Sequence, residues 1–382
     1  MNILIFNGGR GATSIIKNLK KIKKINITSV VNAYDDGKST GEIRKYFEML
    51  GPSDIRKVQS IFLDDKNKNY KDFFNYRFEK DITYNKAIDF LRNFEKILKS
   101  KFNFKEKLTK ELVVFKDIFL NNIYDKQNLF KSDFNFSDCS LINCLYAGSY
   151  IVNNRDISKT IYKFKEIFQI KHDVVPNSID NLNMIALRKD GHVLYSESEI
   201  VNLRSNVILH SIFLIDHKKK LDKAKISNLN FEEKLNYFKK INIIPNLNKN
   251  LIDKIKLANV IIFSPGTQHS SLLPSYTTNN IGHIIANNRN ALKVFITNIG
   301  ADYENPVYIA SDYVANAVKY LDQSSKIKSD ANDYINLIIV NHNNKIDSNK
   351  VHFDKENLKK FNIKFIAKNF EDKLLKGIHD GE

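Results

Sequence analysis

Residues 2–14 read NILIFNGGRGATS, and residues 26–32 read NITSVVN. The first stretch predicts a short buried strand over 2–7 and a glycine-rich loop over 8–11. Apolar residues then recur at helical spacing over 12–21, which predicts a helix. The second stretch is apolar and β-branched and predicts another strand. A strand, a helix and a strand in this order indicate an α/β fold with a parallel sheet and helices on both faces.

The same rhythm returns in the second half of the chain. Strands are predicted at 259–263, 293–298 and 336–340, a helix over 311–321, and a final edge strand near 362–366. The two halves therefore contribute to one large α/β domain, which we expect to cover residues 1–382.

Three segments between these halves differ in character. Residues 65–135 contain no Gly or Pro and are rich in Lys, Asn and Phe at helical spacing. This predicts a helical insertion, which is either a lid over the site or a lateral lobe. Residues 139–170 predict two helices, the first of them buried. Residues 172–215 predict a strand-rich accessory segment, with a hairpin turn at Lys189-Asp190-Gly191.

The bulk composition argues for a cytoplasmic globular protein. Hydrophobic residues make up 42% of the 382 residues, and no apolar run approaches the roughly 18 residues of a membrane span. The start of the chain has no basic region before a long apolar run, so we expect no signal peptide and no membrane partner. Cys139 and Cys144 have no His or Cys neighbours at metal spacing, which predicts buried thiols in a reducing setting.

The net charge of +17 suggests a polyanion partner, but its distribution does not. Lysines occur along the whole sequence, and the densest run, Lys17–Lys24, is typical of the solvated face of a helix. We therefore do not expect nucleic acid as a partner. A nucleic-acid-binding protein would bind with a steep salt dependence.

The loop Gly8-Gly9-Arg10-Gly11 lies between a strand and a helix. Glycines let the backbone approach a phosphate, and a helix N-terminus offers free N–H groups. Arg10 adds a possible charge-assisted contact. The alternative is a glycine-rich turn that only reverses the chain.

A second polar segment, Asp35-Asp36-Gly37-Lys38-Ser39-Thr40-Gly41, directly follows the second strand. In a doubly wound sheet this places two carboxylates at the carboxyl edge, beside the glycine loop. Asp35 and Asp36 suit either a ribose hydroxyl or Mg²⁺. The alternative is an acidic turn that precedes a helix capped by Ser39 or Thr40. Gly37-Lys38-Ser39 is not the end of a P-loop, because Asn32 stands where the first glycine is needed.

Two further segments carry turn residues and hydrogen-bond donors. In Leu50-Gly51-Pro52-Ser53-Asp54-Ile55-Arg56, Asp54 is a candidate cap for the next helix. Ser264-Pro265-Gly266-Thr267-Gln268-His269-Ser270-Ser271 follows the strand at 259–263 and is suited to hold a second part of a ligand. His269 is a general acid, a hydrogen-bond donor or a turn residue.

Taken together and in this order, these segments resemble the 2-phospho-L-lactate transferase family (CofD/YvcK). The matching residues are Gly8, Gly9, Gly11, Asp35, Asp36, Gly37, Ser39, Gly41, Arg44, Pro52, Asp54, Ile55, Arg56, Ser140, Asn143, Pro265, Gly266 and Pro274. The resemblance covers about residues 1–60 and 136–342. It departs from the family pattern at Cys139 and Tyr313, where the family often has His, which indicates a divergent subfamily.

The resemblance implies a doubly wound, Rossmann-like fold, a homodimer and one of two functions. The first is Mg²⁺-dependent transfer of a phosphate-linked group from a nucleotide diphosphate carrier, of the GDP or GTP type, to an acceptor hydroxyl. The second is non-catalytic sensing of a nucleotide sugar or dinucleotide, with Asp36 on a ribose and no metal.

The first function assigns a role to each matching residue. Gly8, Gly9, Arg10, Gly11, Ser39, Pro265, Gly266, Thr267 and His269 would bind the nucleotide and its phosphates. Asp35 and Asp36 would bind Mg²⁺. Asp36, Arg44, Asp54, Arg56 and Asn143 would form the catalytic set, with the two arginines on the transferred group and Asn143 orienting donor or acceptor.

Overall fold

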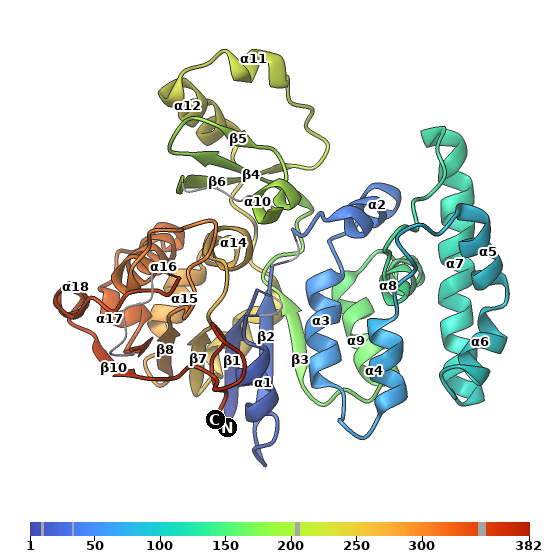
Figure 1. Cartoon of the computed structure of the whole chain (residues 1–382), viewed down its shortest axis with the longest axis horizontal. Helices are drawn as coiled ribbons and strands as arrows, with labels where there is room; N and C mark the ends of the chain where they lie inside the picture. Colours follow the sequence, from blue (N-terminus) through green and yellow to red (C-terminus); the bar gives the residue numbers. More distant parts are fainter. Residues whose placement is uncertain (9–10, 33, 203–206, 343–348) are drawn as a thin grey trace. The chain divides into compact units, whose positions relative to one another are not determined.

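The structure is a computed structural model that describes residues 1–8, 11–32, 34–202, 207–342 and 349–382. The chain forms two compact units. The sheet unit consists of Met1–Asn32 and Val175–Glu382, and the helical unit consists of Ala33–Val174. The helical unit is therefore inserted into the sheet unit directly after the second strand (Figure 1).

Seven strands form the main sheet, in the order β10-β9-β8-β7-β1-β2-β3. They are β1 (Asn2–Phe6), β2 (Asn26–Val31), β3 (Asp173–Pro176), β7 (Val260–Phe263), β8 (Leu292–Ile296), β9 (Leu337–Asn341) and β10 (Lys364–Lys368). The pairs β1–β2, β1–β7, β7–β8, β8–β9 and β9–β10 are parallel. The predicted α/β fold is thus confirmed. β1 is apolar on both faces, as expected of a central parallel strand covered by helices.

The strand order reverses between β1 and β7. On one side of this pair the sheet continues from β1 to β2 and β3, and on the other side it continues from β7 to β8, β9 and β10. Phe6 is in register with Phe263, and the centroids of their stacked rings are 5.3 Å apart. The two strands therefore end level with each other. The loops after β1 and β7 start side by side at the carboxyl edge, where open α/β sheets bind ligands.

Short amphipathic helices connect these strands. They are α1 (Thr13–Leu19), α13 (Lys249–Lys256), the π-helical turn η1 (Gln268–Leu272), α14 (Leu273–Tyr276), α15 (Ile281–Asn287), α16 (Ala310–Ser324), α17 (Ala331–Tyr334) and α18 (Lys355–Lys359). Their apolar faces supply the core residues Ile16, Leu251, Ile285 and Leu321, each fully buried. This alternation of apolar and charged faces is what made the helices visible in the sequence.

A small antiparallel sheet, β5-β4-β6, also belongs to the sheet unit. Its strands are β4 (Leu182–Arg188), β5 (Val193–Leu194) and β6 (Leu209–Asp216), and its helices are α10 (Glu197–Asn202), α11 (Lys223–Ser227) and α12 (Phe231–Ile241). Gly191 turns the β4–β5 hairpin with a φ of 83°, a backbone conformation that favours glycine. Apolar side chains of β4 and β6 pack against Phe238 of α12 and close a separate small core.

The helical unit contains eight helices in its described residues. They are α2 (Lys38–Phe47), α3 (Ser53–Phe62), α4 (Lys68–Asn75), α5 (Tyr84–Arg92), α6 (Phe94–Ser100), α7 (Glu106–Phe130), α8 (Leu141–Val152) and α9 (Ile157–Ile167). α8 is the apolar helix expected from the sequence, and its residues 141–149 are all buried. Cys139 and Cys144 are free thiols in this core, with their sulfur atoms 3.6 Å apart.

Two predicted helix caps are wrong by a few residues. α2 begins at Lys38 with Gly37 as its N-cap, so Ser39 and Thr40 lie inside the first turn. α3 begins at Ser53 after Pro52, so Asp54 also lies in a first turn. In both cases the helix begins before the residue that was predicted to cap it.

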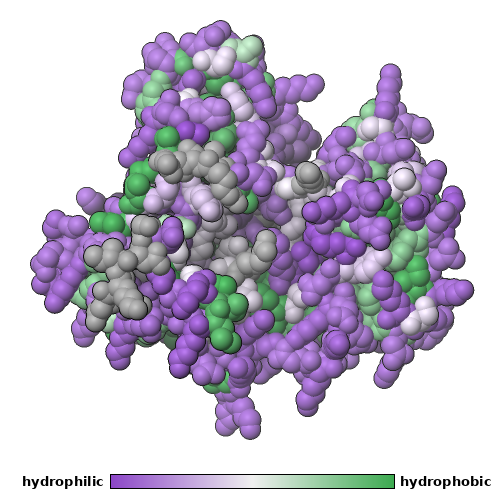
Figure 2. All heavy atoms as spheres, viewed as in Figure 1, coloured by the Kyte–Doolittle hydropathy of each residue, from purple (hydrophilic) through white to green (hydrophobic). Residues whose placement is uncertain are grey.

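Across the part of the chain that the structure describes, no helix is both long and apolar enough to cross a membrane. The face drawn in Figure 2 is hydrophilic over most of its area, as expected from the 27% of charged residues.

Candidate functional site

The glycine loop and the loop after β7 pack directly against each other within the sheet unit. A Cβ atom at Gly11 would lie 2.1 Å from the carbonyl oxygen of Pro265 and 3.0 Å from Gly266 Cα. A Cβ atom at Gly8 would lie 2.3 Å from Ser271 Cβ. Both glycines are therefore required by this close approach. The structure thus brings together four residues predicted to bind phosphate, while Gly9 and Arg10 lie outside the described residues.

Asn298, which follows β8, holds the second loop at Gly266. The Asn298 Oδ1 accepts a hydrogen bond from the Gly266 N–H at 2.8 Å, and its Nδ2 donates to the Gly266 carbonyl at 2.9 Å. Asn298 is 9% exposed, so these bonds are shielded from water. To pair with both the N–H and the carbonyl oxygen of Gly266, a side chain must carry an acceptor and a donor next to each other, as the Asn298 amide does.

We expect Asn298→Asp to lower the free energy of unfolding by roughly 2 kcal/mol at neutral pH, since the Gly266 carbonyl loses its donor and faces a carboxylate. Denaturant unfolding measures this change. Asn250→Asp, at an exposed position of α13, is the control and should change stability by less than about 0.5 kcal/mol. Equal effects of the two substitutions would show that the Asn298 pairing does not hold the loop.

The turn that follows Gly266 is dense in hydroxyl groups. Thr267 Oγ1 lies 2.9 Å from Ser270 Oγ and 2.8 Å from Ser271 Oγ. Asn32, at the end of β2, donates from Nδ2 to the carbonyl oxygens of Ser270 (3.2 Å) and Ser271. Three strand ends, those of β2, β7 and β8, therefore fix one short segment.

His269 lies inside this turn and is 1% exposed. Burial, with smaller contributions from Lys319 and His210, lowers the pKa of His269 to about 3. Its Nδ1 has no hydrogen-bond partner among the described residues. His269 is therefore neutral at pH 7. Of the three interpretations, a buried turn residue fits best, and a general acid that starts as an imidazolium does not fit.

In the helical unit, Asp35 begins a chain of side-chain hydrogen bonds. Its Oδ1 accepts from the Gly37 N–H at 3.0 Å, and its Oδ2 accepts from Thr40 Oγ1 at 3.2 Å. Thr40 Oγ1 lies 2.5 Å from Ser53 Oγ, which accepts from Asn143 Nδ2 at 3.1 Å. The structure therefore connects the acidic segment, the start of α3 and the predicted Asn143 of α8.

The two predicted arginine clamps bind backbone instead. Arg44 donates to the carbonyl oxygens of Tyr34 (3.0 Å) and Asp35 (3.4 Å), and Arg56 donates to that of Phe74 (3.0 Å). They are 7% and 6% exposed. Burial and the neighbouring Arg77 lower the pKa of Arg56 to about 10. These contacts use one terminal nitrogen of each guanidinium group to support the helical unit, and the buried Arg56 Nε has no hydrogen-bond partner among the described residues.

The other predicted residues of the helical unit lie near these supports. Ser39 is buried in the first turn of α2. Asp54 forms an ion pair with Lys57 at 2.7 Å. Asp36 is partly exposed. Within the described residues, no group of three or more His, Cys, Asp or Glu side chains is placed to hold a metal ion.

A family model described as 2-phospho-L-lactate transferase CofD matches residues 3–371. The chain belongs to the CofD family. The match runs through residues 65–135 and past residue 342, beyond the ranges in which the sequence motifs were visible.

Relatives of this CofD-family chain carry another name. Proteins named "Putative gluconeogenesis factor" match from Aquifex aeolicus, at 24% identity over 324 residues, and from Thermotoga maritima, at 22% identity over 325 residues. These matches cover 84% and 85% of this chain and 74% and 76% of the relatives.

A solved structure from Bacillus halodurans, described as a member of the UPF0052 family, is similar with a TM-score of 0.68. It is 19% identical, and the match covers all of this chain and 96% of that one. A likeness at this identity supports the CofD-family fold and says nothing of its ligand.

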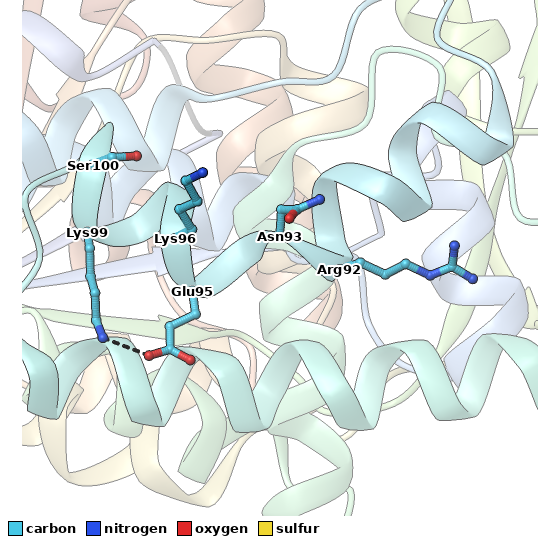
Figure 3. A pocket seen from close by; sticks show the side chains of 6 residues that line it. All are labelled: Arg92, Asn93, Glu95, Lys96, Lys99 and Ser100. Carbon is cyan, nitrogen blue, oxygen red and sulfur yellow. Dashed lines mark hydrogen bonds and ion pairs between the residues drawn. The ribbon is translucent and has the colours of Figure 1, made fainter.

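Two hollows lie away from the predicted residues of this CofD-family chain. The first is a shallow hollow of about 680 Å³ at α5 and α6 (Figure 3). It is lined by Arg92, Asn93, Glu95, Lys96, Lys99 and Ser100. Lys99 pairs there with Glu95 at 2.7 Å and Glu106 at 2.9 Å, so part of its charge is neutralised. The other, of about 360 Å³, lies between β6 and α16. The close-packed loops after β1 and β7 remain the candidate site.

Sequence reasoning missed Asn298 and Asn32 as parts of this site, and also Glu304, whose carboxyl group accepts hydrogen bonds from the backbone N–H groups of His269 and Ser270. Asn298 and Asn32 are the last residues of the strands predicted at 293–298 and 26–32. Polar residues at the ends of parallel strands often contribute to ligand sites, so their position could have identified them. Glu304 lies in a loop before α16, and nothing in its local sequence marked it.

Proposed function

We propose that this protein binds a nucleotide-linked small molecule, with its phosphates held by the loops that follow β1 and β7. One observation supports this most strongly: at the strand-order reversal, the Pro265–Gly266 backbone leaves no room for a side chain at Gly11, and Ser271 leaves none at Gly8. Backbone N–H groups exposed by glycines at such a point are suited to phosphate oxygens.

We further propose that the protein senses this ligand without turning it over. His269 is neutral and buried, and Arg44 and Arg56 are bound to carbonyl oxygens. Part of the hydrogen-bonding capacity that would stabilise charge on a transferred group is thus already used within the protein. The relatives are named "Putative gluconeogenesis factor", a name that states no transfer reaction. A nucleotide sugar or a dinucleotide is the ligand class expected for such a sensor.

Mg²⁺-dependent transfer from a nucleotide diphosphate carrier to a hydroxyl is the second candidate. The description of the family model and the adjacent Asp35 and Asp36 favour it. Both oxygens of Asp35 already accept hydrogen bonds. Because Mg²⁺ is commonly bound by one or two carboxylates with waters and substrate phosphates, this pair fits Mg²⁺ as an incomplete set that requires a phosphate ligand.

A thermal-shift panel with GDP, GTP, UDP-sugars and NADP, each with and without Mg²⁺, tests the proposal. We expect one nucleotide sugar or dinucleotide to stabilise the protein without metal. At about a hundred times its Kd, a ligand adds roughly 2.7 kcal/mol of stability. Stabilisation by a nucleotide diphosphate that requires Mg²⁺ would favour the transferase, and stabilisation by none of these compounds would contradict the proposed function.

Asp36→Asn separates the two candidates. If the acids hold Mg²⁺, this variant loses Mg²⁺-dependent stabilisation, because an amide is a poor ligand for a hard cation. If the protein is a metal-independent sensor, addition of Mg²⁺ changes neither wild type nor variant. Asp253→Asn, at an exposed position of α13, removes the same charge and serves as the matched control.

A further inference from the structure

A buried acid supports the turn that follows Gly266. Glu304 is 2% exposed, and its Oε2 accepts hydrogen bonds from the backbone N–H groups of His269 (2.9 Å) and Ser270 (3.1 Å). Its Oε1 makes a further hydrogen bond with Ser270 Oγ. Three contacts from one side chain therefore fix the segment that packs against Gly8.

Glu304 lies close to a second acid, Asp302, which is partly buried. Asp302 accepts hydrogen bonds from the backbone N–H of Asn305 (2.7 Å), from Asn305 Nδ2 (3.3 Å) and from the Tyr313 hydroxyl (3.3 Å). Neither acid has an ion-pair partner among the described residues. A buried carboxylate beside a partly buried one is costly to ionise when neither has a cation as partner.

The other titratable groups around this pair do not supply positive charge. His269 is neutral because burial lowers its pKa to about 3. Burial raises the pKa of Tyr313, so its hydroxyl stays protonated. Lys319 and His210 contribute to the field at His269 and are not within ion-pair distance of Glu304. Burial and the neighbouring Asp302 accordingly raise the pKa of Glu304 to about 8, against the smaller opposing effect of the hydrogen bonds from Ser270 and His269.

A protonated Glu304 can keep all three observed contacts. Oε2, which accepts two N–H groups, then acts as the carbonyl oxygen. With the proton on Oε1, the contact to Ser270 Oγ persists with the roles reversed, and the Ser270 hydroxyl donates onward to Thr267 Oγ1, 2.9 Å away. Asp302 also accepts from the backbone N–H of Glu304, so it has four donors against three for Glu304 and is the better place for the negative charge.

We infer that Glu304 is a positioning residue that holds the 267–271 turn as a neutral carboxylic acid, and that loss of its proton loosens the turn. The inference deepens the proposed function, on which it rests, because this turn packs against the glycine loop. Deprotonation also adds a negative charge beneath a site proposed to bind phosphate. Ligand affinity should therefore fall as the pH rises toward 9.

The sign of the stability effect follows from linkage. A group whose pKa is raised on folding binds more protons in the folded state than in the unfolded state. Its stabilising contribution is present below the unfolded pKa, near 4.5, and is lost as the pH rises through about 8. Glutamine has nearly the same shape as glutamate and does not titrate, so Glu304→Gln should not show this loss of stability with pH.

The test uses the full-length protein without ligand. We expect the Tm of wild type to fall, relative to that of Glu304→Gln, by roughly 5 °C between about pH 6 and about pH 9. After the intrinsic increase of amide exchange with pH is divided out, the protection of the His269 and Ser270 amides should fall in wild type over this range and stay constant in Glu304→Gln. Glu304→Ala should exchange fast at every pH.

Glu371→Gln is the control of opposite sign. Glu371 is also buried, but Lys350 lies 2.7 Å away and lowers the pKa of its carboxyl group. This substitution should destabilise at pH 6 and at pH 9 alike. If Glu304→Gln does the same, Glu304 acts as a carboxylate and the inference is wrong. A wild type whose amide exchange shows no excess acceleration over Glu304→Gln would also overturn it.

Ligand binding is read out separately. The nucleotide that most stabilises wild type should bind at least about 10-fold more weakly to wild type than to Glu304→Gln at pH 9, and equally at pH 6. If no nucleotide binds, the proposed function fails, while the exchange and Tm measurements still decide the role of Glu304.

Discussion

Gly11→Ala is expected to weaken nucleotide binding by roughly 100-fold, the largest effect we predict for a single methyl group in the site. The new Cβ atom would lie 2.1 Å from the Pro265 carbonyl oxygen. This oxygen belongs to backbone, and the next residue, Gly266, is held by Asn298. The second loop must therefore move away from the first. Isothermal titration with the nucleotide identified in the thermal-shift panel measures the loss.

Gly8→Ala provides an internal comparison, because its clash is with a side chain. The new Cβ atom would lie 2.3 Å from Ser271 Cβ but 3.5 Å from Ser271 Cα. Removal of the serine side chain leaves an ordinary van der Waals contact. The double variant Gly8→Ala, Ser271→Gly should therefore recover most of the affinity that Gly8→Ala loses. No side-chain substitution is expected to rescue Gly11→Ala.

Gly300→Ala is the control for both variants, since the nearest atom to its Cβ would be 3.9 Å away. It should bind nucleotide as wild type does. If Gly11→Ala also binds with unchanged affinity, the paired loops do not hold the ligand, and the proposed function is wrong.

Gly148→Ala is expected to destabilise the helical unit by about 2 kcal/mol. Gly148 lies where α8 crosses α7, and its Cβ atom would lie 1.8 Å from the Phe115 carbonyl oxygen. An extra methyl group that forces two packed helices apart costs about 3 kcal/mol. Alanine in place of glycine within a helix offsets about 1 kcal/mol of this cost. Denaturant unfolding, with hydrogen exchange of α7 and α8, measures the result.

The helical propensity of alanine makes this prediction easy to contradict. If α8 were held only by local sequence preference, Gly148→Ala would stabilise the protein. Slower exchange in α7 and α8 of the variant would show that the two helices do not pack as closely as the structure places them. Gly300→Ala again serves as the control.

Periodicity predicted the main elements of the sheet unit to within a few residues. The expected strands at 2–7 and 259–263 are β1 and β7, and the expected helix at 311–321 is α16. These elements carry their signal locally, because buried parallel strands are apolar throughout and surface helices alternate apolar and charged faces.

Residue roles were predicted less well where a side chain had several equivalent uses. Arg44 and Arg56 carry charge that suits a phosphate, and in the structure both hold backbone carbonyl oxygens. Arg44 lies on α2, which packs against α7 and α8, and Arg56 lies on α3, which packs against α4 and α8. No local pattern reports this packing. Ser39 and Asp54 were equally plausible caps, but the bends at Gly37 and Pro52 decide where the helices begin.

The sequence by itself determined the order of strands and helices, the glycine loop at the end of β1 and the family to which the chain belongs. The tertiary structure alone decided that Gly11 faces Pro265, that Asn298 pairs with Gly266 and that Glu304 lies beneath the turn. The reason is physical. Secondary structure follows from neighbours a few positions away, whereas each of these contacts joins residues 32 to 254 positions apart, which only the folded sheet brings together.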